Sequence, residues 1–76
     1  MLDICLLKQV INDSGYKKTF IAERIGISYQ AFLNKIEGRT EFVATEIVKF
    51  CDLLQLNNQV RDKIFFAKKV DKTSTN

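Results

Sequence analysis

Residues 18–38 read KTFIAERIGISYQAFLNKIEG, and the spacing of apolar side chains in this stretch decides the fold that we expect. Ile21 and Ile25 are four residues apart, which places both side chains on one face of a first helix. Phe32 and Ile36 have the same spacing and mark a second helix. Two short helices that each carry an apolar face must bury those faces in a common core.

The residues between the two expected helices are suited to a tight turn. Gly26 can take a positive φ and end the first helix, and Ser28 can cap the start of the second. Ala22 is small at the point where the second helix has to cross closely. A short helix, a tight turn and a second helix with a shared core describe a helix-turn-helix, so the chain is a candidate for DNA binding.

The segment resembles the helix-turn-helix of small phage regulators, the Cro and lambda-type repressor family that is often called XRE-type. The matching residues are Ile21-Ala22, Gly26-Ile27-Ser28, Phe32 and Gly38. Residues 42–56 are similar to the fourth helix of that family, and the stretch 64–70 resembles the ending of small phage proteins from Gram-positive hosts. Many members carry an apolar residue three positions after Phe32, where this chain has Lys35, and we expect Ile36 to take that packing role.

The expected fold is all-α, and the resemblance implies a compact five-helix, lambda-repressor-like DNA-binding domain over residues 1–70. A frayed polar tail is expected over residues 71–76. The apolar pattern places helices at residues 3–14, 18–25, 29–37, 44–55 and 59–66. We also expect Phe42 to fold back onto the core and Asn58 to cap the last helix.

The positive charge of the chain is concentrated around the expected helix-turn-helix. The chain has 12 basic and 9 acidic residues, a net charge of +3. Residues 17–40 contain five of the basic and two of the acidic residues, so this window carries the whole excess. That distribution is typical of a surface that binds phosphate. The alternative explanation is a chance fluctuation of surface charge.

In a helix-turn-helix, the N-terminal part of the second helix meets base edges in the major groove. The residues that we expect to contact bases are Ser28, Tyr29, Gln30 and Asn34. An amide carries a donor and an acceptor, which match adenine, and the Tyr29 ring could lie against a thymine methyl group. The alternative is a solvated polar helix face. Leu33 fits the edge of the core better than a base contact.

Phosphate contacts are expected on both sides of the second helix, from Lys17, Lys18, Thr19, Lys35, Arg39 and Thr40. The first three lie at the start of the expected helix 18–25, where free backbone N–H groups favour an anion. The other three flank the end of the second helix. Such contacts set affinity and register without reading sequence, although any single lysine is as well explained as a solubilising charge.

The two cysteines, Cys5 and Cys51, sit among apolar residues of helical pattern. Their separation matches no zinc motif, and the chain has no histidine to complete one. We expect both side chains to pack in the core, with a disulfide or a redox role as the alternatives.

The C-terminal apolar residues Ile64, Phe65, Phe66 and Val70 are too large and too many for a free tail. They could dock on the same chain or join two copies. A single helix-turn-helix of this size covers few base pairs, so a homodimer is expected, with Phe65 or Phe66 contributing across a two-fold axis.

Enzymatic activity is not expected, because histidine and a glycine-rich phosphate loop are missing and the acids are scattered. No metal, cofactor or small-molecule ligand is implied. The longest apolar runs are four residues, and Asp3 does not suit a signal peptide, so we expect neither a membrane segment nor secretion, and a location in the cytoplasm of a bacterial host.

Together these features predict sequence-specific binding of a double-stranded DNA operator, and the resemblance implies a Cro- or repressor-like transcriptional regulator of a phage or prophage. The competing prediction is a protein-interaction module, anti-repressor or antitoxin-like, that uses the same scaffold.

Overall fold

The computed structural model describes residues 2–67, and within that range it contains five α-helices and no strand. In chain order the helices are α1 (Ile4–Ser14), α2 (Lys18–Ile25), α3 (Tyr29–Ile36), α4 (Ala44–Leu54) and α5 (Asn58–Phe65). The predicted all-α fold is confirmed. The polar tail that we expected at residues 71–76, and Val70 before it, lie outside the described residues.

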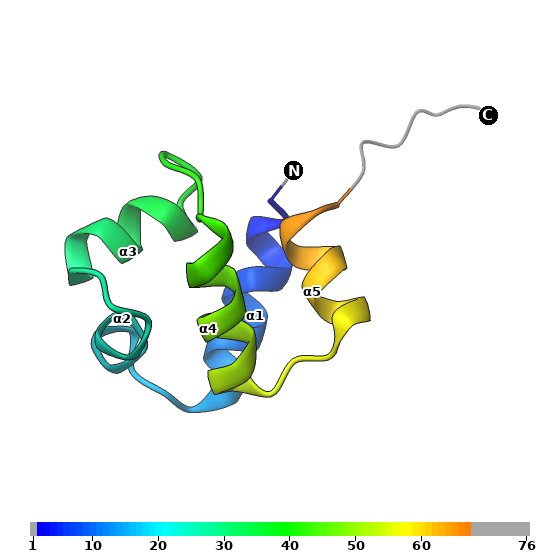
Figure 1. The fold of residues 1–76 in the computed structure, drawn as a ribbon, viewed down its shortest axis with the longest axis horizontal. Coiled ribbons are helices and arrows are strands. Elements are labelled where there is room, and N and C mark those ends of the chain that lie inside the picture. The colour runs from blue at the N-terminus through cyan, green and yellow to red at the C-terminus, as the bar shows by residue number, and fades with distance from the viewer. Residues whose placement is uncertain (1, 68–76) are drawn as a thin grey trace.

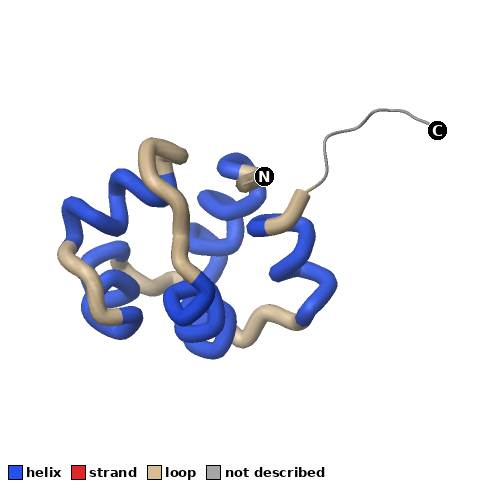
Figure 2. The backbone as a smooth tube through the Cα atoms, turned by 45° about the horizontal axis from the view of Figure 1, so that its top comes forward, coloured by secondary structure: helices blue, strands red, loops and turns tan. Residues whose placement is uncertain are grey.

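The α2–α3 pair lies on one side of α4 in Figure 1, α5 lies on the other side, and α1 lies behind. α2 is seen nearly end-on whereas α3 runs across the view, so their axes cross steeply (Figure 1). α2 packs against α3 and α4, and α1 packs against α3, α4 and α5. Short loops join the helices (Figure 2), and the helices share one core.

The turn between α2 and α3 forms as its sequence predicts. Gly26 has a φ of +86°, and its N–H group donates to the carbonyls of Ala22 at 3.0 Å and Glu23 at 3.1 Å. The Ile27 N–H group also donates to the Ala22 carbonyl, at 3.0 Å. Ser28 Oγ accepts from the Ala31 N–H group at 3.1 Å and so caps α3.

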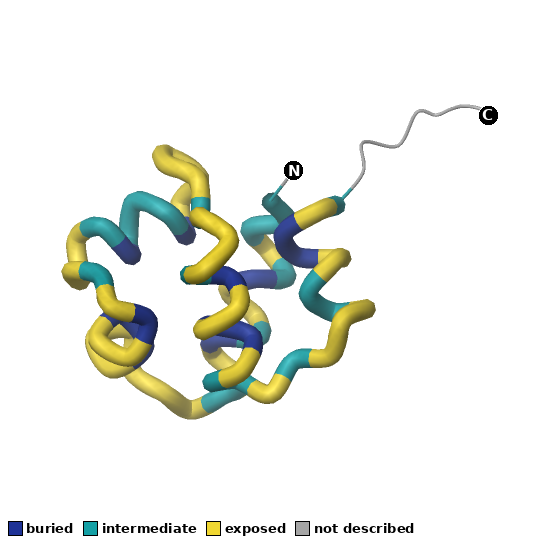
Figure 3. The backbone as a smooth tube through the Cα atoms, viewed as in Figure 1, coloured by how far each residue is buried: buried dark blue, intermediate teal, exposed yellow. Residues whose placement is uncertain are grey.

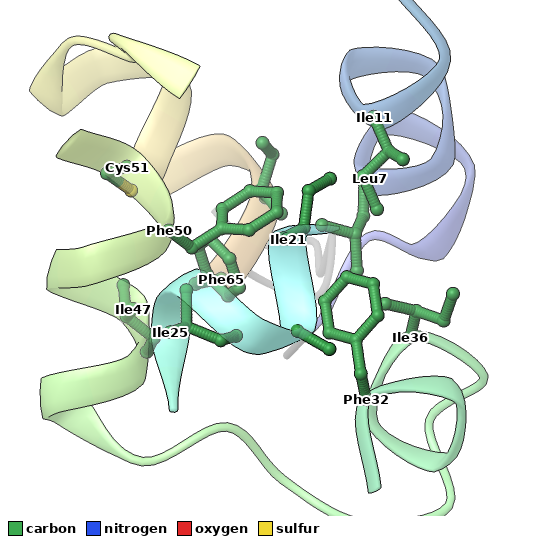
Figure 4. Packing of buried hydrophobic residues seen from close by; sticks show 12 residues of the cluster. Leu7, Ile11, Ile21, Ile25, Phe32, Ile36, Ile47, Phe50, Cys51 and Phe65 are labelled. Carbon is green, nitrogen blue, oxygen red and sulfur yellow. The ribbon is translucent and has the colours of Figure 1, made fainter. Parts of the chain in front are cut away.

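The buried residues come from all five helices (Figure 3), and their side chains face one another across the centre of the molecule (Figure 4). They are Leu7, Ile11, Ile21, Ala22, Ile25, Phe32, Ile36, Ile47, Phe50, Cys51, Ile64 and Phe65. No polar or charged residue within 2–67 is buried. All five residues that we predicted to form the shared core of α2 and α3 are buried, namely Ile21, Ala22, Ile25, Phe32 and Ile36. Ile36 thus takes the packing role that Lys35 cannot take, as predicted.

Phe42 connects the aromatic part of the core although it lies in the loop before α4. Its ring centroid is 6.5 Å from that of Phe32, 6.4 Å from that of Phe50 and 5.2 Å from that of Phe65. Phe50 and Phe65 lie 5.7 Å apart in an edge-to-face arrangement, which the ring quadrupoles favour. The prediction that Phe42 folds back onto the core is confirmed.

The observed helix ends differ from the predicted ones by at most one residue, and the predicted cap of the last helix was wrong. The cap of α5 is Asn57, whose side-chain oxygen accepts from the Val60 N–H group at 2.8 Å, and Asn58 is already the first helical residue. Two adjacent asparagines can each act as a cap, and the sequence alone does not choose between them. α4 has no capping side chain on Val43, and instead Glu46 Oε1 accepts from the Val43 N–H group at 3.0 Å.

The two cysteines differ in their surroundings. Cys51 is buried as predicted, and burial raises the pKa of its thiol, which favours the neutral form. Cys5 is exposed, so the prediction that it packs in the core was wrong. The apolar neighbours of Cys5 in sequence belong to a different face of α1, whose buried residues are Leu7 and Ile11. Both thiols are free.

Candidate nucleic-acid interface

The start of α2 and the start of α3 border the same shallow hollow, which has a volume of about 740 Å³. Lys17, Lys18 and Thr19 line it from the beginning of α2, and Tyr29 lines it from the first turn of α3. The structure therefore brings three of the predicted phosphate-contacting residues and one of the predicted base-contacting residues to one surface.

The N-terminus of α2 has no side-chain cap, because its capping residue is Lys17, whose side chain cannot accept a hydrogen bond. The first backbone hydrogen bond of the helix runs from the Ile21 N–H group to the Lys17 carbonyl at 3.0 Å, which leaves the N–H groups of Lys18 to Phe20 without a helical acceptor. Lys17, Lys18 and Thr19 are all exposed. Free N–H groups, the helix dipole and two ammonium groups together favour an anion here.

The outer face of α3 carries polar side chains that are exposed or half-buried. Tyr29 is 45% exposed, Gln30 is exposed and Asn34 is half-buried. Gln30 Nε2 donates to Asn34 Oδ1 at 3.4 Å, so the two amides lie side by side, one helical turn apart. Leu33 packs against the core as a half-buried residue, as we predicted.

Ser28 also lies on this face, but its hydroxyl already accepts the capping hydrogen bond from Ala31. A hydroxyl oxygen has a second lone pair and a proton that can still be donated. The side chain is exposed, so it could contact DNA while it caps α3.

Arg39 and Thr40 are exposed in the loop that follows α3, at the opposite end of that helix from Tyr29. Their backbone N–H groups donate to the Asn34 carbonyl, at 2.9 Å and 3.4 Å. Gly38, with a φ of +81°, allows the chain to turn back in this way. The two side chains are thereby held beside the end of α3.

Lys35 differs from the other predicted phosphate contacts, because its ammonium group is engaged within the chain. Nζ lies 3.1 Å from Glu46 Oε1 and donates to the Glu41 carbonyl at 3.0 Å. The Lys35 and Glu46 side chains are each only 13% exposed. A phosphate would have to compete with both partners, so the geometry favours a structural role for this lysine.

Sequence reasoning missed the contribution of α1 to the hollow. Lys8 and Asn12 line it, and Lys8 Nζ lies 3.1 Å from Glu37 Oε2 in an exposed ion pair. That pair neutralises one of the two acidic residues in the basic window. Only tertiary packing brings α1 beside the end of α3, and no local pattern in the sequence signals it.

The second feature that the sequence did not reveal is a row of side chains along the outside of α2. The Tyr16 and Phe20 rings lie 5.2 Å apart, and the Arg24 guanidinium lies 5.7 Å from the Phe20 ring centroid. Phe20 and Arg24 are four residues apart on one face of α2, and Tyr16 adjoins Phe20 from the loop before the helix. Both rings are more than a third exposed, at 41% and 37%.

The two C-terminal aromatic residues have opposite environments. Phe65 is buried in the core of its own chain, which matches the docking alternative, whereas Phe66 is 54% exposed. Of the two rings that we predicted at a dimer interface, only that of Phe66 is available to a second copy without unpacking the core.

The described part of the chain offers no grouping of three or more acidic, cysteine or histidine side chains that could hold a metal ion. Across residues 2–67, none of the helices has both the length and the apolar character that a membrane span requires. Comparisons of the chain with protein-family models, with curated proteins and with solved structures found no match.

Proposed function

We propose that this chain is a sequence-specific DNA-binding protein, a transcriptional regulator of the Cro or repressor type that acts in the bacterial cytoplasm. In this proposal α2 and α3 form a lambda-repressor-like helix-turn-helix, with α3 in the major groove. The observation that carries the proposal is the shared surface at the starts of α2 and α3, where uncapped N–H groups and two lysines lie beside Tyr29.

The proposed contacts divide into two classes. Tyr29, Gln30 and Asn34 read base edges, with Ser28 at the start of the same face. Lys17, Lys18 and Thr19 hold one backbone of the duplex, and Arg39 and Thr40 hold the other, which fixes the register of α3 in the groove. Arg39 and the two α2 lysines are exposed, and no salt bridge within residues 2–67 involves them.

We expect binding to duplex DNA to weaken steeply with salt, because each cation that meets a phosphate releases condensed counterions. Three contacts per protomer, from Lys17, Lys18 and Arg39, give a log–log slope of roughly −3 per protomer, at about −0.9 per contact. Fluorescence anisotropy on a pool of random duplexes measures this slope. Lys18→Ala should weaken all sequences alike and reduce the slope by about 0.9 per protomer.

The matched control is Lys63→Ala, which removes an exposed lysine from α5, away from the proposed interface. It should leave the slope unchanged. If the unaltered chain shows no salt-dependent binding to duplex DNA at low ionic strength, the proposal of DNA binding is wrong, and the protein-interaction alternative takes its place.

We further propose that the working unit is a two-fold dimer on an inverted repeat, with half-sites about 34 Å apart. The face formed by α4 and the end of α5 supports this, because Val48 and Phe66 are 56% and 54% exposed there. Both border a hollow of about 430 Å³, together with Ala44 and Ile47. Arg61, which also borders it, is paired with Asp62 at 2.9 Å, so this face carries little net charge against a second copy.

Replacing Val48 by aspartate should prevent dimerisation, because the face would then bring two carboxylates into an apolar contact. Sedimentation equilibrium without DNA should show a dimer for the unaltered chain and a monomer for Val48→Asp. Tyr16→Ala, which removes an exposed ring near α2, is the control and should stay dimeric. An unaltered chain that is monomeric and also forms a strict one-to-one complex with a duplex carrying the inverted repeat would contradict the dimer while leaving DNA binding untouched.

A further inference from the structure

The loop between α3 and α4 is held by the side chain of one lysine. Lys35 Nζ reaches past the loop to Glu46 of α4, at 3.1 Å, and also donates to the Glu41 carbonyl within the loop, at 3.0 Å. Its ammonium group lies 6.0 Å from the Phe42 ring centroid. One cation therefore joins the end of α3, the middle of the loop and the first turn of α4.

Glu46 has two partners in this arrangement, because its Oε1 atom accepts from the Val43 N–H group as well as facing Lys35 Nζ. Both side chains of the ion pair are only 13% exposed, so water screens the pair less than it screens an open surface pair. The pair is the only salt bridge within residues 2–67 whose two side chains are both less than a third exposed.

The same loop carries Arg39 and Thr40, the proposed contacts to phosphate, and both are exposed. Their N–H groups are bonded to the Asn34 carbonyl on one side, and the Lys35 ammonium holds Glu41 on the other. The segment that carries both phosphate contacts is thus anchored at each end by a residue of α3. Its position relative to the proposed reading face depends on these anchors.

We propose that Lys35 and Glu46 are positioning residues, which fix the 38–43 loop so that Arg39 and Thr40 meet the DNA backbone, and that Lys35 itself contacts no phosphate. This inference rests on the proposed DNA binding. Fixing the loop beforehand removes part of the ordering cost that a mobile loop would incur on binding.

Glu46→Gln separates the two possible roles of Lys35. The variant keeps an amide oxygen for the Val43 N–H group but removes the charge that holds Lys35. If Lys35 were a phosphate contact, its release would strengthen binding and make the salt slope steeper by about 0.9 per protomer. If Lys35 positions the loop, binding to random duplexes should weaken about three- to tenfold, the loss expected when a charge-assisted contact is disturbed.

The matched control is Glu41→Gln, which makes the same charge change five residues earlier, within the 38–43 loop. Lys35 bonds the backbone carbonyl of Glu41 and not its carboxylate, so this variant keeps the anchor. It corrects for the general gain in affinity that follows the loss of any negative charge near DNA. If the affinity of Glu46→Gln for random duplexes equals or exceeds that of Glu41→Gln, the inference is overturned.

A second comparison places Lys35→Met in an Arg39→Ala background. If Lys35 acts through Arg39, adding Lys35→Met to Arg39→Ala should have little further effect on affinity for DNA. Two independent phosphate contacts would instead give additive losses of binding free energy. Additive losses would overturn the inference. In the free protein, Lys35→Met should also speed amide exchange at Arg39 and Thr40, which a simple phosphate contact would not do. Failure of the unaltered chain to bind DNA would overturn the proposed function, and this inference with it.

Discussion

Replacing Phe50 by alanine should lower the free energy of unfolding by about 3–5 kcal/mol, the largest effect that we expect from a single substitution in this chain. The Phe50 side chain is fully buried, and its ring lies against Phe42 and Phe65. The loss is comparable with the whole stability of a domain this short, at roughly 0.05–0.15 kcal/mol per residue. Urea unfolding followed by circular dichroism measures the change.

The control for this prediction is Phe20→Ala, because Phe20 is 37% exposed and its ring contacts Tyr16 and Arg24 on the outside of α2. We expect it to cost about 1 kcal/mol or less, since it removes one exposed stacking contact and leaves no cavity. Equal losses for Phe50→Ala and Phe20→Ala would contradict the described core.

The single substitutions Gln30→Ala and Asn34→Ala should each cost about 1–3 kcal/mol of binding free energy on the preferred DNA site and little on random duplexes. The Gln30 amide nitrogen donates to Asn34 Oδ1, so the two side chains support each other. Because they are in contact, the double variant should lose less than the sum of the single losses. The preferred site has first to be selected from a random pool, after which anisotropy gives both affinities.

Gln59→Ala provides the matched control, since it removes an exposed amide from the first turn of α5. It should bind the preferred site and random DNA as the unaltered chain does. If Gln30→Ala and Asn34→Ala weakened both kinds of DNA equally, the two amides would be positioning or phosphate contacts, and the reading face of α3 would have to be placed elsewhere.

Local chemistry explains why so much of the α2–α3 unit could be predicted. Gly26 ends α2 with a positive φ and Ser28 caps α3, and both effects depend on residues within one turn of the site where they act. The buried residues Ile21, Phe32 and Ile36 follow from helical spacing alone. These are the interactions that a sequence encodes locally.

The features that could not be predicted depend on contacts between segments that are distant along the chain. The Lys35–Glu46 pair links α3 to α4, and the Lys8–Glu37 pair links α1 to the end of α3. The exposure of Cys5 depends on which face of α1 turns inward against the other helices. Composition and periodicity carry no information on such pairings.

The central claim is that duplex DNA binds across the starts of α2 and α3 and the loop after α3. A backbone-amide NMR titration with duplex DNA tests it most directly, because it reports every residue in one experiment. We expect shifts to concentrate at residues 17–20, 28–34 and 38–41, and the amides of α5 to be little affected by DNA contact. Shifts that concentrate on α4 and α5, or no shifts at low ionic strength, would contradict the account.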